Sequence, residues 1–501
     1  MQSILNLTKT NKLILATFAF LAVLAFGSGR AHAATLTVSG GCTLDEAITS
    51  VNTTTSEPGC SPSGVYGSSD TINIPAGTIT LSSDIDMITV PVTVQGAGMN
   101  QTTIDGNAGQ YSGLSADNTN ITIKDLKITA YRTAAIYAQR SNVTLNNIEV
   151  DGADVQETTS GSRMYGIYIN NFTSDTHTVT ADSVYIHGIH ATSTNGEGGL
   201  FVYMVSQSGG GTTNATLSNT TLDDISAFDG TPMNGFSMAI LGSRGTVNST
   251  ITNATINDIT SNTLVAPFAS IAFAESGSAT VTTNVYNATI TGLRGQTGSG
   301  VPVAGIKSAA FYSATAGYNS GDVGTATVNV GNSLFADNLN DGVSSNCSTG
   351  DMTSVLGGSG SGVPTITSDD YNISDDATCT SFTGAHDQQN VSNIISTLGP
   401  LQNNGGNVPT RALLDGSPAI SAGGTVLGVT TDARGIARPG TCPSVGAFQF
   451  EGAVCSASTT NAGGANAGAP NTGIGSVSIL ATAIVGLLGL AALGYAFAKR
   501  A

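Results

Sequence analysis

Tryptophan is absent from this 501-residue sequence, and charged residues make up only 10% of it. Basic residues are scarce, with 16 Lys and Arg against 33 Asp and Glu, which gives a formal net charge of −17. Such an acidic chain repels phosphate, which excludes a basic nucleic-acid-binding protein. Hydrophobic residues still make up 40%, so charge-driven disorder is excluded as well. Without tryptophan the best surface for stacking on sugars is missing, although tyrosine could substitute.

The N-terminus has the pattern of a secretory signal peptide, assigned to residues 1–33. Lys9 and Lys12 precede an apolar run at 13–26, and small residues follow up to a predicted cleavage site after Ala33. The alternative is a short membrane anchor, which is disfavoured because the run is too short to span a bilayer comfortably. The protein is therefore expected to be exported.

The C-terminus predicts attachment to the cell surface. Residues 476–498 are an uncharged run that would span about 34 Å as a transmembrane helix, and the basic tail at 499–501 belongs on the cytoplasmic side. The preceding Gly-, Ala- and Asn-rich stalk (456–475) contains Pro470, Asn471, Thr472 and Gly473. This order resembles the sorting signals of Gram-positive-type surface proteins, in which a sortase joins the Thr to the envelope. Ala469 replaces the usual Leu, so covalent wall attachment and a plain membrane anchor both stay open.

The exported part between these ends holds all the acidic residues and all the cysteines. With five basic residues in the two ends, it carries 11 basic and 33 acidic residues, a net charge of −22. An even number of cysteines in an exported chain, with no Cys-x-x-Cys pair, favours disulfides over metal sites. Proximity along the chain favours the pairs Cys42–Cys60, Cys347–Cys379 and Cys442–Cys455. Free thiols are the alternative if the organism lacks an oxidising machinery.

Residues 101–340 repeat a pattern in which β-branched or apolar residues alternate with Thr and Asn, as in strands. The apolar anchors of successive copies lie 34 residues apart at Leu222, Ile256 and Ile290, and 22 apart at Leu126 and Ile148. Short strands with a repeat of roughly 20–40 residues and no helical periodicity predict a parallel solenoid. Asn at repeated positions suits left-handed corners or side-chain ladders, and the 63 glycines suit corners too.

A stack of β-sandwich domains is the alternative fold, but the Asn-Gly and Asp-Gly pairs that hairpins favour are sparse and irregular here. The repeats resemble the right-handed parallel β-helix of pectin-lyase-like proteins. This resemblance implies an all-β solenoid, to which the ends add an N-terminal cap and a C-terminal transmembrane anchor helix. Such folds often carry glycan lyases and hydrolases, so signs of an enzyme have to come from the residues themselves.

The N-terminal part of the exported chain (34–100) carries Cys-Thr-Leu-Asp-Glu-Ala-Ile at 42–48 and Pro-Ala-Gly-Thr-Ile-Thr-Leu at 75–81. These runs resemble the CSLREAI-type module at the start of many bacterial surface β-helix proteins, with Asp45 in place of the usual Arg. Three apolar residues fall on one face of a short predicted helix: Leu44, Ala47 and Ile48. That face could plug the open end of the first coil.

The C-terminal part (341–455) carries Leu-Gly-Pro-Leu-Gln-Asn-Asn-Gly-Gly at 398–406, a Pro-Thr-Arg-Ala-Leu-Leu-Asp-Gly-Ser-Pro-Ala-Ile run at 409–420, and Gly-Ala-Phe-Gln-Phe-Glu at 446–451. This region resembles the choice-of-anchor Q domain, a C-terminal β-helix segment of envelope proteins. In that family the domain precedes an anchoring device. Ser421 stands where the family usually has Asp.

Two pairs of residues are candidates for a catalytic or metal site. Asp223 and Asp224 are adjacent, so on a strand their side chains point to opposite faces. The same place one repeat later reads Asn257-Asp258, and a turn is therefore favoured over catalysis. His187 and His190 lack a third ligand at a recognisable spacing, so a surface turn is favoured over a metal or acid–base site.

Two further charged groups lie in the C-terminal part. Four carboxylates near Cys379 could bind Ca²⁺ loosely, but a solvated acidic loop is favoured: Asp369, Asp370, Asp375 and Asp376. Asp432, Arg434 and Arg438 are expected to form a structural ion network rather than a site. No cofactor is therefore expected, and Ca²⁺ is the one candidate ion.

The leading hypothesis is a non-catalytic β-helix protein, displayed on the cell surface and anchored by its C-terminus to the membrane or cell wall. Its role would be adhesion or shielding, with a surface glycan or a protein as ligand and no nucleic acid. The first alternative is a surface polysaccharide lyase or glycoside hydrolase. The second is a self-assembling surface-layer component.

Overall fold

The computed structural model describes most of residues 32–452. The described range omits residues 68, 154–163, 191–197, 207–209, 228–237, 262–267, 275–276, 296–310, 318–320, 352–361, 363 and 427. The predicted signal peptide, the stalk with its 470–473 motif, the 476–498 run and the basic tail lie outside the described residues. In the described part of the chain, no helix is both long and apolar enough to cross a membrane.

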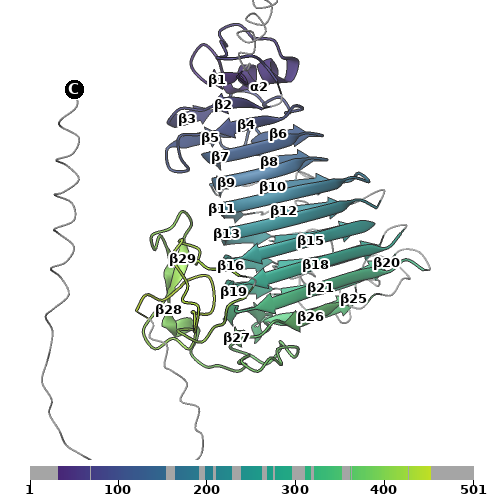
Figure 1. The fold of residues 1–501 in the computed structure, drawn as a ribbon, viewed down its shortest axis with the longest axis vertical. Coiled ribbons are helices and arrows are strands. Elements are labelled where there is room, and N and C mark those ends of the chain that lie inside the picture. Colours follow the sequence, from purple (N-terminus) through teal and green to yellow (C-terminus); the bar gives the residue numbers. More distant parts are fainter. Residues whose placement is uncertain are drawn as a thin grey trace, which may run out of the picture. The chain divides into compact units, whose positions relative to one another are not determined.

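Most of the described chain forms two parallel sheets (Figure 1). The large sheet contains β1 (Thr35–Thr37), β2 (Asp70–Asn73), β3 (Gly77–Thr80), β4 (Val92–Gln95), β5 (Thr102–Asp105), β7 (Asn120–Thr129), β9 (Asn142–Asp151), β11 (Thr176–His190), β13 (Thr212–Ala227), β15 (Gly245–Thr252), β16 (Thr255–Ser261), β18 (Ala279–Tyr286), β19 (Thr289–Gly295), β21 (Gly324–Gly331), β22 (Leu334–Ala336), β23 (Leu339–Asn340), β24 (Val343–Ser344), β26 (Thr365–Ser368) and β27 (Ile373–Ser374). The small sheet contains β6 (Leu114–Asp117), β8 (Ala134–Gln139), β10 (Met164–Asn171), β12 (Gly198–Ser206), β14 (Met238–Ser243), β17 (Phe268–Ala274), β20 (Phe311–Gly317) and β25 (Cys347–Asp351).

The chain passes from one sheet to the other and back in each turn of the stack. Strands β7, β9, β11 and β13 follow one another in the large sheet, while β8, β10 and β12 lie between them in sequence and pair in the small sheet (Figure 1). Each strand thus pairs in parallel with the strand one coil later. The predicted all-β parallel architecture is confirmed, and it is compatible with a β-helix.

The apolar anchors of the sequence repeats are register partners in adjacent strands. Leu126 lies opposite Ile148, and Ile256 lies between Leu222 and Ile290. All five side chains are at most 1% exposed. Each coil therefore buries its apolar residues against the equivalent residues of its neighbours, which is where the core sits.

Asparagines occupy a left-handed corner in successive coils, as the repeats suggested. Asn219, Asn253, Asn287 and Asn332 have φ of 51°, 54°, 54° and 51°. Their side chains also form ladders: Asn253 Nδ2 donates to Asn219 Oδ1 at 3.2 Å, and Asn332 Nδ2 donates to Asn287 Oδ1 at 2.5 Å. Asn tolerates this conformation better than most residues, because its short polar side chain can hydrogen-bond locally.

A short helix, α2 (Leu44–Thr53), lies at the N-terminal end of the stack (Figure 1). The apolar face predicted for it is buried: Leu44, Ala47 and Ile48. Thr43 and Glu46 form a capping box, in which the Thr43 N–H donates to Glu46 Oε2 at 2.7 Å and the Glu46 N–H to Thr43 Oγ1 at 3.3 Å. Asp45, the departure from the CSLREAI-type pattern, accepts a hydrogen bond from the Asp86 N–H at 2.8 Å. This contact ties the helix to the chain that precedes β4.

Two of the three predicted disulfides are formed. Cys42 is joined to Cys60 and Cys347 to Cys379, with Cα–Cα distances of 4.7 and 4.8 Å. The first closes the chain around α2, and the second joins β25 to the loop that follows β27. The third pair, Cys442–Cys455, stays a prediction because Cys455 lies outside the described residues.

After the last coil the chain turns back, and residues 398–452, which we call the flank segment, lie along the side of the large sheet (Figure 1). A short 3-10 turn, η1 (Ile395–Thr397), leads into β28 (Leu398–Gln402) and β29 (Thr410–Leu413), which pair antiparallel. Thr221 Oγ1 donates to the Pro409 carbonyl at 2.7 Å, and the Ala447 N–H donates to Thr289 Oγ1 at 3.0 Å. The flank segment therefore bonds to the corners of several coils.

Part of the predicted ion network is present in the flank segment: Asp432 and Arg434 form an ion pair, whereas Arg438 bonds to neutral groups. Asp432 is fully buried and accepts from Arg434 Nε at 2.9 Å and Nη2 at 2.8 Å, and from the Gln449 N–H at 2.8 Å. Arg438 is 9% exposed and donates to the Gly446 carbonyl at 2.6 Å and to Asn253 Oδ1 at 3.2 Å. Burial lowers the pKa of Arg438 to about 10. This guanidinium links the flank segment directly to the asparagine corner of a coil.

Candidate functional site

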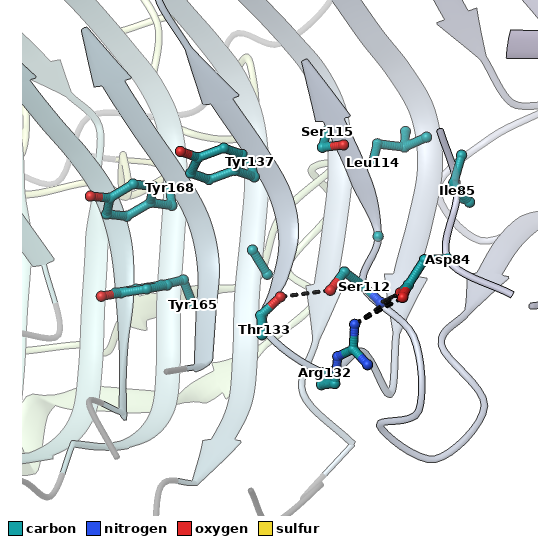
Figure 2. A pocket seen from close by; sticks show the side chains of 12 residues that line it. Asp84, Ile85, Ser112, Leu114, Ser115, Arg132, Thr133, Tyr137, Tyr165 and Tyr168 are labelled. Carbon is teal, nitrogen blue, oxygen red and sulfur yellow. Dashed lines mark hydrogen bonds and ion pairs between the residues drawn. The ribbon is translucent and has the colours of Figure 1, made fainter. Parts of the chain in front are cut away.

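The small sheet carries a cleft of about 640 Å³ beside three tyrosines (Figure 2). We call it the tyrosine cleft, and its lining includes Asp84, Ser115, Arg132, Tyr137, Tyr165 and Tyr168. Its volume lies within the range of roughly 300–1,000 Å³ that is usual for small-molecule sites. The loop before β4, strands β6, β8 and β10, and the turn before β8 supply the walls.

The tyrosine rings pack together because parallel coils place equivalent residues side by side. Tyr137 on β8 is the register partner of Tyr168 on β10, and their rings stack with centroids 5.3 Å apart and planes 8° apart. Tyr165 lies against Tyr168 at 4.7 Å and 36°. Burial, followed by the nearby Asp117 charge, raises the pKa of Tyr137, so its hydroxyl stays neutral at physiological pH.

The polar rim of the tyrosine cleft is made by an ion pair and two hydroxyls. Arg132 Nη2 donates to both oxygens of Asp84, at 3.1 and 3.0 Å, and these side chains are 41% and 55% exposed. The hydroxyls of Ser112 and Thr133 are 2.6 Å apart (Figure 2). A cleft with aromatic faces on one side and exposed hydrogen-bonding groups on the other can bind a ligand that is itself apolar on one face.

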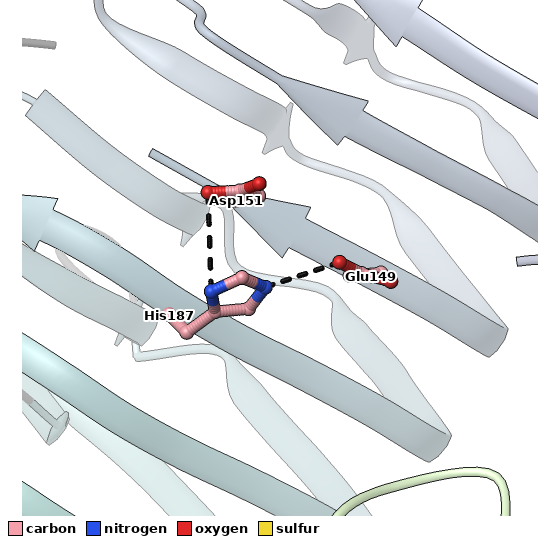
Figure 3. A group of neighbouring side chains, drawn as sticks. All are labelled: Glu149, Asp151 and His187. Carbon is pink, nitrogen blue, oxygen red and sulfur yellow. Dashed lines mark hydrogen bonds and ion pairs between the residues drawn. The ribbon is translucent and has the colours of Figure 1, made fainter. Parts of the chain in front are cut away.

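A second candidate site lies on the large sheet (Figure 3). His187 Nε2 is 3.1 Å from Glu149 Oε1, and its Nδ1 is 3.8 Å from Asp151 Oδ1. Lys127 Nζ bridges the same two carboxylates, 2.9 Å from Glu149 and 2.7 Å from Asp151. With Asp223, described below, these side chains make up what we call the charged row.

The side chains of the charged row are only partly exposed, and their pKa values are shifted. Burial raises the pKa of Glu149 and Asp151, but hydrogen bonds and charges outweigh burial and hold both pKa values below the ordinary range. For Glu149 the bonds come from His187 and Lys127, and for Asp151 the main one comes from Lys127. Burial lowers the pKa of Lys127, yet its bonds to the two carboxylates raise it overall. Lys127 is therefore firmly cationic.

Glu149, Asp151 and His187 offer ligand atoms that all lie within 4.8 Å of one another, so among the described residues they form a set that could hold a metal ion. His187 gains these neighbours from the preceding coil, where Asp151 is its register partner. The Lys127 ammonium, however, already bonds to both carboxylates. A divalent cation would have to displace this positive charge, and the row is better described as an ion-pair network than as a metal centre.

The two acidic residues of the sequence pair separate, as adjacent strand residues should. Asp223 is half-buried at the register position next to His187 and accepts from Asn257 Nδ2 at 2.7 Å. Burial, with added repulsion from neighbouring carboxylates, raises the pKa of Asp223. Asp224 is exposed at a left-handed corner with φ of 52°, and its Oδ1 is 2.9 Å from His190 Nε2. The structure thus puts Asp223 in the charged row, and Asp224 lies outside that row at a left-handed position within β13 rather than in the turn that the sequence suggested.

The four carboxylates weighed for Ca²⁺ are engaged by protein donors. Asp369 accepts from Tyr286 Oη at 2.6 Å, and Asp370 is 2.7 Å from His386 Nδ1. Asp375 accepts from the Asp337 N–H at 2.7 Å, and Asp376 accepts from the Asn346 N–H at 3.0 Å. These bonds shape the turns around Cys379 and give a structural reason for the acidic residues.

Sequence reasoning missed both the tyrosine cleft and the contacts of the charged row. A signal for the cleft was present in the repeated Ile-Tyr at 136–137 and 167–168, which falls at the same place in two coils. Comparison with known protein families finds no family model that matches the chain, and comparison with curated proteins finds none that matches it. The site is therefore interpreted from its geometry.

Lys127→Met is expected to lower the free energy of unfolding by about 1–3 kcal/mol at pH 7, between the values for exposed and buried ion pairs. The pKa values of Glu149 and Asp151 are lowered in the folded state, so their contribution is present above their ordinary pKa values and lost as pH falls through the lowered ones. The difference from the wild type should therefore be largest at pH 7 and shrink as the pH falls below the ordinary pKa values of these carboxyl groups. Urea unfolding at several pH values measures it.

The matched control is Lys124→Met, which removes a positive charge from the same strand, β7, outside the charged row. It should change stability by less than about 0.5 kcal/mol. An effect of Lys127→Met that is equally large at pH 3 and pH 7 would show that lost packing, rather than lost charge, is responsible.

Proposed function

We propose that this chain is an exported, envelope-anchored β-helix protein that acts by binding a ligand on another surface, in the manner of an adhesin. The observation that carries the proposal is the tyrosine cleft, a preformed concave site with aromatic faces and an exposed polar rim. Shielding or lateral self-assembly would not require such a cleft. Binding therefore accounts for the site better than either alternative.

The rest of the proposal rests on the sequence. The coils are proposed to wind as a right-handed, pectin-lyase-like β-helix, with a CSLREAI-type module at the start and a choice-of-anchor Q-type region at the end. The signal peptide would direct export, and the 476–498 run with or without sortase attachment at Thr472 would hold the chain on the envelope. The parallel coils and the cap helix support this architecture.

A direct test couples the compact unit that ends at Cys455 to beads and measures binding to a panel of cells and purified envelopes. We expect saturable binding that free protein competes away. Absence of saturable binding from the whole panel would overturn the proposal. Growth of ordered particles in light scattering, without binding, would support the surface-layer alternative instead.

A surface glycoside hydrolase is the second candidate, and one observation favours it. In the charged row the pKa of Asp223 is raised by burial while that of Glu149 is lowered by its bonds to His187 and Lys127, so the two carboxyl groups lose their protons over different pH ranges. A general acid that works with a base or nucleophile requires two carboxyl groups whose pKa values differ in this direction. Because Asp223 keeps its proton to a higher pH than an ordinary aspartate, such hydrolysis would decline as pH rises through that pKa.

Incubation with uronic-acid and neutral glycans distinguishes the two functions. Under the binding proposal, we expect no turnover from the wild type, Asp223→Asn or Asp224→Asn. Turnover that Asp223→Asn abolishes, by about 10²-fold or more, and that Asp224→Asn leaves intact would replace the binding proposal with the enzyme. Asp224→Asn is the matched control because its side chain lies at a corner outside the charged row.

A further inference from the structure

We propose that the tyrosine cleft binds an uncharged pyranose oligosaccharide, with one sugar ring stacked on Tyr137. This inference rests on the proposed binding function and names the ligand class of the same site. Three features of the cleft support this inference. The tyrosine stack ends at Tyr137, polar side chains line the rim, and the one cation and one anion of the lining are paired.

The aromatic stack ends at Tyr137. One face of its ring is covered by Tyr168 on β10, and the strand on the other side of β8 is β6. There the register partner of Tyr137 is Ser115, whose small side chain leaves the next place in the stack unfilled (Figure 2). The cleft thus extends from the outer face of Tyr137 to Ser115, where a further ring would lie.

A pyranose ring suits this place. Its axial C–H groups form an apolar face that packs on an aromatic ring, and its edge carries hydroxyl groups that need hydrogen-bond partners. The hydroxyl of Tyr137 already has a partner, because it donates to Gln139 Oε1 at 2.9 Å. The ring face is therefore presented as an apolar surface, while the polar partners come from the rim.

The rim supplies donors and acceptors for those hydroxyls. The Asp84 carboxylate has two acceptor oxygens, and the Arg132 guanidinium has a planar set of donors. Arg132 uses Nη2 to bond both oxygens of Asp84, and both side chains remain partly exposed. Each group can therefore hydrogen-bond to a ligand without giving up the ion pair. The hydroxyls of Ser112 and Thr133 add two further partners.

The charge balance favours a neutral sugar over an acidic one. The residues that line the cleft include one cation, Arg132, and one anion, Asp84, and these are paired. Arg140, on the turn after β8, is likewise paired with Asp117 on β6. The exported part of the chain has a net charge of −22 and would repel a polyanionic glycan. A volume of about 640 Å³ with an open rim suits a short oligosaccharide rather than a single ring.

The experiment titrates the compact unit that ends at Cys455 with cellotriose, maltotriose and lactose, and with trigalacturonate as the acidic comparison. Ligand-observed NMR and calorimetry are the readouts. We expect at least one neutral probe to bind and trigalacturonate to bind more weakly. Tyr137→Ala should weaken binding by about tenfold, and Tyr137→Phe should retain it because the ring stays.

Ser115→Tyr provides a second variant that leaves Tyr137 and the rim intact. It would extend the aromatic stack into the cleft, so we expect it to abolish sugar binding without lowering the melting temperature. Binding of a neutral probe that survives both Tyr137→Ala and Ser115→Tyr would overturn the inference. Binding of no neutral probe, or tighter binding of trigalacturonate, would overturn it as well.

The bead assay distinguishes a failure of the sugar inference from a failure of the proposed binding function. Saturable cell binding that Ser115→Tyr leaves unchanged would show that the protein binds surfaces elsewhere, and only the sugar inference would fall. Absence of cell binding by the wild type would overturn the proposed function itself. Loss of both sugar and cell binding in Ser115→Tyr is the result expected if both are right.

Discussion

Replacing Asp432 by Ala is expected to release the flank segment from the coils and to lower its free energy of local unfolding by about 3–5 kcal/mol. Asp432 is fully buried and is the acceptor for both Nε and Nη2 of Arg434. It also accepts from the N–H groups of Arg434, Ile436 and Gln449. Alanine would remove the buried carboxylate partner of Arg434, whose Nη1 would keep only the exposed Glu451 as an anionic partner at 3.0 Å. It would also leave three backbone N–H donors without their acceptor, and each of these losses is costly.

Limited proteolysis and amide hydrogen exchange would measure this release. We expect faster cleavage within residues 398–452 and loss of exchange protection there, while the protection of β9, β11 and β13 changes little. Asp415→Ala is the matched control, because Asp415 is an exposed carboxylate of the same segment. Equal protease resistance of the two variants would show that Asp432 does not hold the flank segment in place.

Ile256→Ala is expected to lower the free energy of unfolding by about 2–5 kcal/mol. Ile256 is 1% exposed and lies between its register partners Leu222 and Ile290 in the stack of coils. A cavity at this position removes contacts with the coil before and the coil after. Because each coil is stabilised mainly by its neighbours, the loss would weaken both of its interfaces.

Denaturant unfolding followed by circular dichroism checks this expectation. Ile256→Val, which removes only one methylene group, should cost about 0.5–1.5 kcal/mol. Val343→Ala, at a side chain that is 69% exposed, should change stability by less than about 0.5 kcal/mol. If Ile256→Ala were as mild as Val343→Ala, the apolar stack would not be the main source of stability.

The parallel stacking of the coils could be predicted from the sequence because it follows from one repeated interaction. Leu222, Ile256 and Ile290 are spaced evenly, and stacking equivalent apolar residues is the arrangement that buries all of them. The asparagine corners follow from the same repeat, since residues such as Asn253 and Asn287 recur where the chain has to turn. At these positions the preference of each residue for burial or for a left-handed corner matches its place in the stack of coils.

The sites could not be predicted in the same way, because they depend on which coils are neighbours when coil length varies. Tyr137 meets Tyr168 across 31 residues, whereas it meets Ser115 across 22. His187 lies 36 residues after Asp151, its register partner. Loops of different length between strands change these separations without changing the stack. A count along the sequence therefore identifies the residues but not the neighbours that give them their chemistry.

The docking of the flank segment has a mechanical consequence. Its hydrogen bonds reach Ser183, Thr221, Asn253 and Thr289, which belong to successive coils. Tension applied at its C-terminal end would therefore load several coils at once and in shear. If the chain instead left the stack from its last coil, the same pull would peel the coils away one after another. The side-on attachment therefore spreads the force over several coils, and no single coil carries all of it.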